Sequence, residues 1–183
     1  MNERKHRPRA GGNKYRGQRP ATAPTAPRAP RATARTVAFE VMRAVHEEDA
    51  FANLLLPRSI ERAGLSTADA ALATELTYGT LRRQGYYDAV IALAASRPVD
   101  QIDSPILDAL RLGAHQLLST RVASHAAVNE SVGLARTVGG QSTTGFVNAV
   151  LRTISRDTPE SWLERVLEGA RSDDERLSLE HSH

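Results

Sequence analysis

The chain has 183 residues, a formal net charge of +3 and no cysteine. Without cysteine it has neither a disulfide framework nor a cysteine-based zinc site, and no apolar run reaches the 18 residues that a membrane span requires. No apolar segment follows the basic start either, so the sequence predicts no secretory signal. We therefore expect a soluble, cytoplasmic protein with no membrane partner.

Charge is distributed unevenly along the chain. Residues 1–34 hold nine Lys/Arg and one acid, a net charge of +8, whereas residues 35–183 hold 15 basic and 20 acidic residues, a net charge of −5. The stretch RPATAPTAPRAPRATAR has four prolines and no large apolar side chain. This composition predicts a disordered tail over residues 1–33. Such a tail attracts nucleic acid by counterion release, or alternatively only keeps the chain soluble.

Apolar residues then recur at helical spacing through most of the chain. The first half predicts four helices, over residues 34–47, 49–65, 66–84 and 85–96. Pro57 should kink the second helix or start a new turn in it, and Gly64 should end it. Ser66 has the position of an N-cap for the third.

The second half predicts four more helices, which begin at Ser104, Ser124, Thr143 or Thr144, and Pro159, the last one ending near Ala170. Ser104 and Ser124 are the expected N-caps. The buried face of the first of these helices is expected at Leu107, Leu110, Ala114, Leu117 and Leu118. No alternating strand pattern with hairpin turns appears. The sequence therefore predicts an all-α fold, a bundle of seven to eight helices.

No pattern in the sequence indicates catalysis or metal binding. A glycine-rich loop after a strand is missing, and no two histidines have the spacing of a helical zinc site. His46 is expected at a solvated helix end, and His115 and His125 are expected at the surface or in caps. We therefore expect this chain to contain no catalytic residue, no metal and no cofactor.

Two asparagines, Asn129 and Asn148, lie inside the helical segments of residues 125–152. Each follows a valine of the apolar stripe, so its amide should border the core. Leaving a buried amide unsatisfied costs about 1–3 kcal/mol. We expect both amides to bind the ends or loops of adjacent helices and to fix the relative placement of two bundles. The alternative is that one of them contacts a base or phosphate.

Four blocks in chain order carry a family resemblance: DALRLGAHQLL, ASHAAVNESVGLAR, GG and GFVNAVLR. They are similar to the NusB-like helical domain. The version most similar is the one at the N-terminus of the RsmB/Sun (Fmu) family of ribosomal RNA cytosine-C5 methyltransferases. The segments ARTVAFEVMRAV and LTYGTLRRQGYYD resemble the early helices of that family. The resemblance covers about residues 34–156.

This resemblance implies a NusB-like fold of two small helical bundles that binds RNA, over residues 34–171. In the family, a catalytic domain that binds S-adenosylmethionine follows. Methylation at C5 requires a cysteine thiolate that adds to the base, and this chain has no cysteine. We therefore expect an accessory domain that is inert alone, with residues 172–183 beginning the linker to a missing catalytic domain. Its expected partners are 16S ribosomal RNA and that domain, and we expect a monomer.

The resemblance also implies which residues contact RNA. In NusB-like domains the Arg-rich start of the first helix and the Phe of the F-V-N block engage RNA, and these match Arg35 and Phe146. Six further arginines lie on or beside the motif helices and are candidates too: Arg82, Arg83, Arg111, Arg121, Arg136 and Arg152. Alternatively, Phe146 belongs to the core and the arginines form a solvated face.

Two other functions fit the same sequence. One is a stand-alone NusB-type transcription antitermination factor, which binds RNA together with a ribosomal protein. The other is a scaffold that orients the catalytic domain without touching RNA. The LRLGAHQ and YGTLRRQGYYD blocks favour the methyltransferase version.

Overall fold

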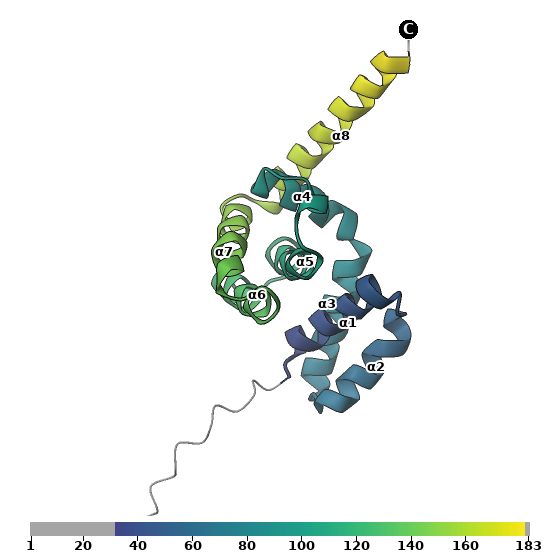
Figure 1. Ribbon diagram of the computed structural model, residues 1–183, viewed down its shortest axis with the longest axis vertical. Coiled ribbons are helices and arrows are strands. Elements are labelled where there is room, and N and C mark those ends of the chain that lie inside the picture. The colour runs from purple at the N-terminus through teal and green to yellow at the C-terminus, as the bar shows by residue number, and fades with distance from the viewer. Residues whose placement is uncertain (1–31, 182–183) are drawn as a thin grey trace, which may run out of the picture. The chain divides into compact units, whose positions relative to one another are not determined.

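The computed structural model describes residues 32–181, and the side chains of residues 32–174. This part of the chain contains eight α-helices, one short 3-10 helix and no strand (Figure 1). Their bounds are α1 Ala34–Glu48, α2 Ala52–Ala63, α3 Thr67–Arg82, α4 Gln84–Ala95, η1 Val99–Gln101, α5 Ser104–Ser119, α6 Ser124–Gly139, α7 Gln141–Ser155 and α8 Pro159–His181. The predicted all-α fold is confirmed. No helix in this range is long and apolar enough to cross a membrane.

Thr33 begins α1 with a reciprocal pair of cap hydrogen bonds. Its hydroxyl accepts from the Thr36 N–H at 3.2 Å, and the Thr36 hydroxyl oxygen accepts from the Thr33 N–H at 2.6 Å. Thr33 is therefore part of the fold, although the sequence assigned it to the tail. The rest of the predicted tail, residues 1–31, lies outside the described residues.

Several predicted boundaries are correct because the signals are local. Ser66 accepts from the Asp69 N–H at 3.1 Å and begins α3. Gly64 ends α2 with φ of 63°, a conformation that glycine adopts without a steric penalty. Pro57 lies inside α2 without ending it.

Other boundaries are wrong by one or more residues. Ser104 and Ser124 are the first helical residues and not caps; Asp103 and Ala123 precede them, and neither gives a side-chain cap bond. The Ser104 hydroxyl instead accepts from Arg43 Nη1 at 3.0 Å. In addition, α7 begins at Gln141, before the expected threonines, and α8 continues well past Ala170.

Two apolar clusters hold the helices together. The smaller lies between α1, α2 and α3 and includes Val37, Val41 and Leu56. The larger surrounds α5 and also receives Phe39 and Met42 of α1. Because α1 contributes to both, the two expected bundles form one compact unit.

Helix α5 lies in the middle of this unit (Figure 1), and every residue from Ile106 to Gln116 is buried. A helix with only one apolar face was expected here. The polar residues of its other faces, among them Asp108, Arg111 and His115, are buried too. Since buried polar groups require partners, the neighbouring helices must supply them.

The carboxylate of Asp108 is fully buried and contacts three basic side chains, two arginines and one histidine. It accepts from Arg43 Nη1 at 2.8 Å and from Arg111 Nη1 at 3.1 Å. His46 Nδ1 lies 2.8 Å from Asp108 Oδ1, the oxygen that also accepts from Arg111, in an ion-pair contact that is bent and not linear. Arg111 also donates to both oxygens of Asp88, at 2.7 and 2.9 Å. This Asp108 network joins α1, α4 and α5.

His46 belongs to the Asp108 network and does not lie at a solvated helix end as expected. Its Nε2 donates to Gln84 Oε1 at 2.8 Å, so oxygen acceptors face both ring nitrogens. The contact with the Asp108 carboxylate favours the imidazolium and raises the pKa of His46.

His115 is buried as well, contrary to the surface or cap position expected for it. Its Nε2 donates to Glu75 Oε1 at 2.9 Å, and its Nδ1 accepts from the Tyr87 hydroxyl at 2.6 Å. A Cβ at Gly79 would lie 2.5 Å from His115 Cε1, so α3 can pass this close only with glycine there. Burial lowers the pKa of His115.

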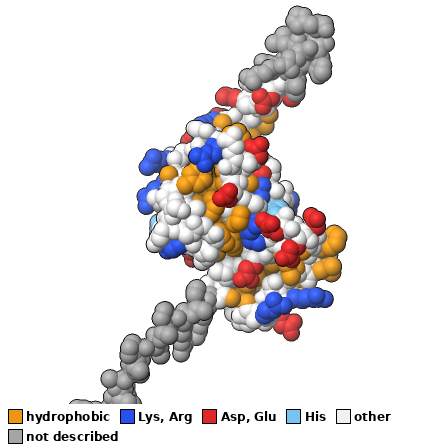
Figure 2. Space-filling view, viewed as in Figure 1, with side chains coloured by type: hydrophobic (Ala, Val, Ile, Leu, Met, Phe, Trp, Pro, Cys, Tyr) orange, Lys and Arg blue, Asp and Glu red, His pale blue; other side chains and the backbone are white. Residues whose placement is uncertain are grey.

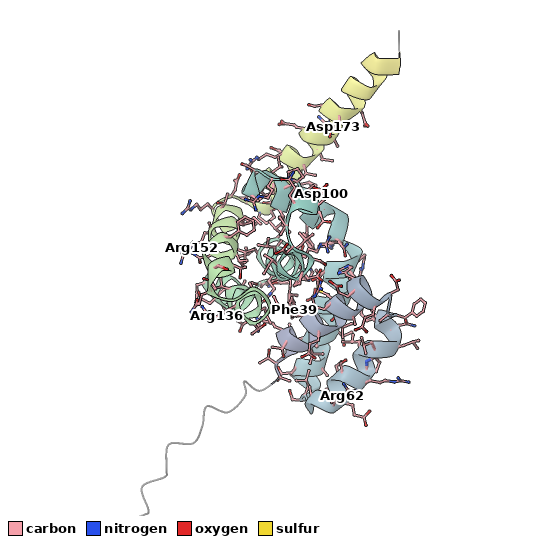
Figure 3. The ribbon with its side chains drawn as sticks, viewed as in Figure 1. Phe39, Arg62, Asp100, Arg136, Arg152 and Asp173 are labelled. Atoms are coloured by element: carbon pink, nitrogen blue, oxygen red, sulfur yellow. The ribbon has the colours of Figure 1, made fainter. Side chains whose placement is uncertain are left out.

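Replacing the buried carboxylate tests how much the Asp108 network contributes. We expect Asp108→Asn to lower the free energy of unfolding by about 3–5 kcal/mol, because Arg43 and Arg111 lose the buried carboxylate that they share and keep only Glu47 and Asp88. Urea denaturation measures this change. The control is Asp100→Asn, which changes an exposed side chain of η1 (Figure 3) and should have little effect. A loss below about 1 kcal/mol for Asp108→Asn would show that the network is dispensable.

The half-buried His46 and the buried His115 predict a stability maximum near the ordinary histidine pKa of about 6.5. His46 has a raised pKa in the folded state, so its contribution is complete below that value and is lost as pH rises through the raised pKa. His115 has a lowered pKa, so its contribution is complete above that value and is lost as pH falls. Denaturation at about pH 5 to 8 should therefore give the highest unfolding free energy near the middle. His46→Gln should remove the fall in unfolding free energy on the alkaline side of the maximum. The control His125→Gln, which changes an exposed side chain, should keep that fall.

Candidate nucleic-acid interface

Arg35, expected to contact RNA, is held against the protein. Its Nε donates to Gln116 Oε1 of α5 at 2.7 Å, and the guanidinium forms an ion pair with Glu130 of α6. The side chain is only 18% exposed. Arg35 therefore ties the start of α1 to α5 and α6, and one carboxylate already balances its charge.

Arg111, also expected to contact RNA, is instead enclosed by the fold. The residue is 8% exposed, and Asp88 and Asp108 occupy its donors. A guanidinium enclosed in this way cannot reach a phosphate without breaking the core. Arg111 stabilises the fold by joining α4 and α5.

The remaining candidate arginines, Arg82, Arg83, Arg121, Arg136 and Arg152, are exposed. The first two lie at the end of α3, and Arg121 lies in the connection between α5 and α6. Figure 3 shows Arg136 and Arg152 on the α6–α7 side of the bundle. In Figure 2 blue side chains gather along this edge, whereas red ones lie mainly toward the other helices of the same face. The exposed cations are therefore available to an anionic partner.

Phe146 is half-buried. It is thus partly a core residue, and it also has exposed surface that a ligand could contact. Its ring packs against the larger apolar cluster and lines a groove together with Ile102 and Ile106. The guanidinium of Arg97 lies 5.0 Å from the ring centroid, a cation–π contact. Part of the ring thus remains open to a ligand.

The prediction that Asn129 and Asn148 bind neighbouring helix ends is wrong. Asn129 is exposed, and Asn148 Oδ1 accepts from Arg152 Nε of its own helix at 3.0 Å. The preceding valines, Val128 and Val147, are the buried residues. One residue further along an α-helix turns the side chain by about 100°, so both amides point away from the core.

Asn129 and Arg152 instead line one groove between the start of α6 and the end of α7. Its other lining residues are Ser124, His125, Val128 and Ser155. We call this the α6–α7 groove. No acidic side chain lines it. In residues 32–174, moreover, no cluster of His, Asp and Glu could hold a metal ion.

Comparison with known proteins gives both a family and a set of relatives. The model of the NusB family matches residues 32–156. A putative methyltransferase of Mycobacterium tuberculosis is 49% identical over 140 residues, which are 76% of this chain and 31% of the relative. The probable ribosomal RNA small subunit methyltransferase B of Bacillus subtilis is 30% identical over 152 residues, 82% of this chain and 33% of the relative. The chain thus spans about a third of the length of these relatives.

A solved structure of antitermination factors NusB and NusE in complex with dsRNA is similar in fold. It has a TM-score of 0.61 and 22% identity, and the match covers 67% of this chain and 93% of that one. At this identity the likeness shows the fold alone.

Asn129 is exposed, and the half-buried Asn148 bonds to Arg152 of its own helix, so we expect both amides to contribute little to stability. We expect Asn129→Ala and Asn148→Ala each to stay within about 0.5 kcal/mol of the unchanged protein, as is usual for surface sites. Thermal or urea denaturation measures both. A loss above about 1 kcal/mol at either site would restore the interpretation that the amides hold neighbouring helices.

Proposed function

Because the chain belongs to the NusB family, we propose that it is the RNA-binding accessory domain of a ribosomal RNA methyltransferase. The parent would transfer a methyl group from S-adenosylmethionine to cytosine C5 of 16S ribosomal RNA in the cytoplasm. One observation carries the proposal: the chain matches about a third of the length of relatives that are named small subunit methyltransferase B. The remaining two thirds of such a protein are long enough to hold the catalytic part.

The residues of this chain fit an accessory role. Cytosine C5 methylation requires a cysteine nucleophile, and the 183 residues contain none. The chain would instead hold the ribosomal RNA while another domain binds the cofactor and carries out the chemistry. Exposed arginines on α3, α6 and α7 supply cations for phosphates. We infer a monomer that binds RNA through these surfaces.

An apolar groove between α4 and α8 supports a second partner, the catalytic domain of the same parent. Ala92, Leu93, Val166 and Ala170 are among its lining residues. Leu163 and Leu167 of α8 are nearly half exposed. An apolar groove with exposed leucines on one of its helices is typical of an interaction site. We propose that the catalytic domain covers it.

A second candidate function is transcription antitermination together with a ribosomal protein. The fold similarity to the antitermination factors NusB and NusE favours it. The relatives at 49% and 30% identity, however, are named methyltransferases. We therefore rank the accessory role first.

Methyl transfer by the parent enzyme tests the proposed function. Transfer of labelled methyl groups from S-adenosylmethionine to small-subunit ribosomal RNA is compared for the parent with and without the segment that corresponds to this chain. The truncated enzyme should lose at least about tenfold in kcat/KM, mainly through a higher KM for RNA. Unchanged kcat/KM would contradict the role in RNA binding. A parent without methyl transfer, combined with tight binding of a ribosomal protein by this chain, would favour antitermination.

The basic tail predicts a strong salt dependence of RNA binding. Deleting residues 1–31 keeps the Thr33 cap of α1 and removes nine cations. The slope of log K against log salt should flatten by about 0.7 for each lost contact to a single strand. Titration of a ribosomal RNA fragment at several salt concentrations measures the slope. Equal slopes for both proteins would show that the tail does not contact RNA and only keeps the chain soluble.

A further inference from the structure

We propose that the α6–α7 groove binds a phosphodiester group of the RNA backbone, with Arg152 as its main ligand-binding residue. This inference rests on the proposed function, because it specifies how the domain would bind RNA. It also assigns a role to Asn129 and Asn148, two helical asparagines that packing of the core does not require.

The groove brings together polar side chains from both ends of the α6–α7 pair. Ser124, His125 and Asn129 come from the first turns of α6, and Arg152 and Ser155 come from the last turns of α7. Hydroxyl and amide groups donate hydrogen bonds to phosphate oxygens, and an arginine adds a charge. The set therefore matches a phosphodiester, whose oxygens only accept.

Asn148 orients Arg152 for this purpose. Its Oδ1 accepts from Arg152 Nε at 3.0 Å, so both Nη groups of the guanidinium remain for a ligand. None of the ion pairs in residues 32–174 involves Arg152. Arg35 and Arg111 differ, since carboxylates already neutralise both. Asn148 is thus a positioning residue, and Arg152 is a charged donor held in place.

The surroundings of the groove favour an anion as well. None of its lining residues is acidic. Ala123 caps α6 without a side-chain hydrogen bond, so the N–H groups of Ser124 and His125 have no intrahelical acceptor. These N–H groups are additional donors for an anion. The proposal itself rests on the side chains of the groove.

The groove is separate from the two positions at which the family resemblance places RNA. Arg152 follows Phe146 by six residues, a rise of about 9 Å along α7. On α6, Glu130 follows Asn129 and holds Arg35 near the start of α1. A bound strand that follows the outer face of α6 could therefore contact the groove and the start of α1 together.

Binding of a short single-stranded fragment of small-subunit ribosomal RNA to the whole chain tests this inference. Arg152→Gln should weaken binding about tenfold, as expected for one charge-assisted contact. It should also flatten the salt slope by about 0.7. The matched control is Arg62→Gln, which removes an exposed arginine of α2, remote from the groove (Figure 3). Circular dichroism and denaturation verify that both variants remain folded.

A double-mutant cycle tests the role of Asn148. Asn148→Ala should weaken RNA binding in the unchanged protein but have no effect in the Arg152→Gln background, because it acts only through the guanidinium. Asn129→Ala should weaken binding in both backgrounds, since its amide contacts the ligand directly.

The possible results separate this inference from the proposed function. Equal RNA affinity for Arg152→Gln and Arg62→Gln would overturn the groove as a phosphate site while leaving RNA binding by the domain intact. An Asn148→Ala effect that persists without Arg152 would overturn the positioning role. Absence of any RNA binding by the unchanged chain would overturn both the groove and the proposed function.

Discussion

The buried carboxylate of Asp108 determines how the helices can pack around α5. A charge in the interior is tolerated only with close partners, because desolvation costs several kcal/mol per ion. Arg43, His46 and Arg111 supply those partners from α1 and α5, and Asp88 of α4 completes the network. With its charge balanced, α5 can be enclosed on all sides and serve as the axis around which the other helices pack. Displacing any of these helices would leave a buried charge unpaired.

The same constraint explains why the motifs of the sequence occur together. The DALRLGAHQ block supplies Arg111 and His115, and the YGTLRRQGYYD block supplies their partners Asp88 and Tyr87. Gly79 in the second block leaves room for His115. The motif residues therefore form hydrogen bonds between helices and stabilise the fold. The RNA contacts that we propose use other side chains, the exposed arginines of α3, α6 and α7.

Local signals allowed much of the fold to be predicted from sequence. Helical periodicity gave the class, and the Ser66 cap and Gly64 gave boundaries that the structure confirms. Long-range pairing could not be predicted, because spacing along the chain does not show that Arg111 and Asp88 meet. The sequence alone therefore predicts Arg111 as a surface cation, whereas the structure buries it. Asn129 and Asn148 were placed at the core because each follows a buried valine, although one step along a helix turns the side chain outward.

The charged side chains of α5 maintain the fold, and we propose that surface cations contact RNA. The most direct test measures the unfolding free energy and the RNA affinity of Arg111→Lys, which keeps the charge but cannot reproduce the two-pronged contact with Asp88. We expect a clear loss of stability, while the protein that remains folded binds RNA with unchanged affinity. Full stability combined with weakened RNA binding would contradict this expectation, because Arg111 would then be a recognition residue.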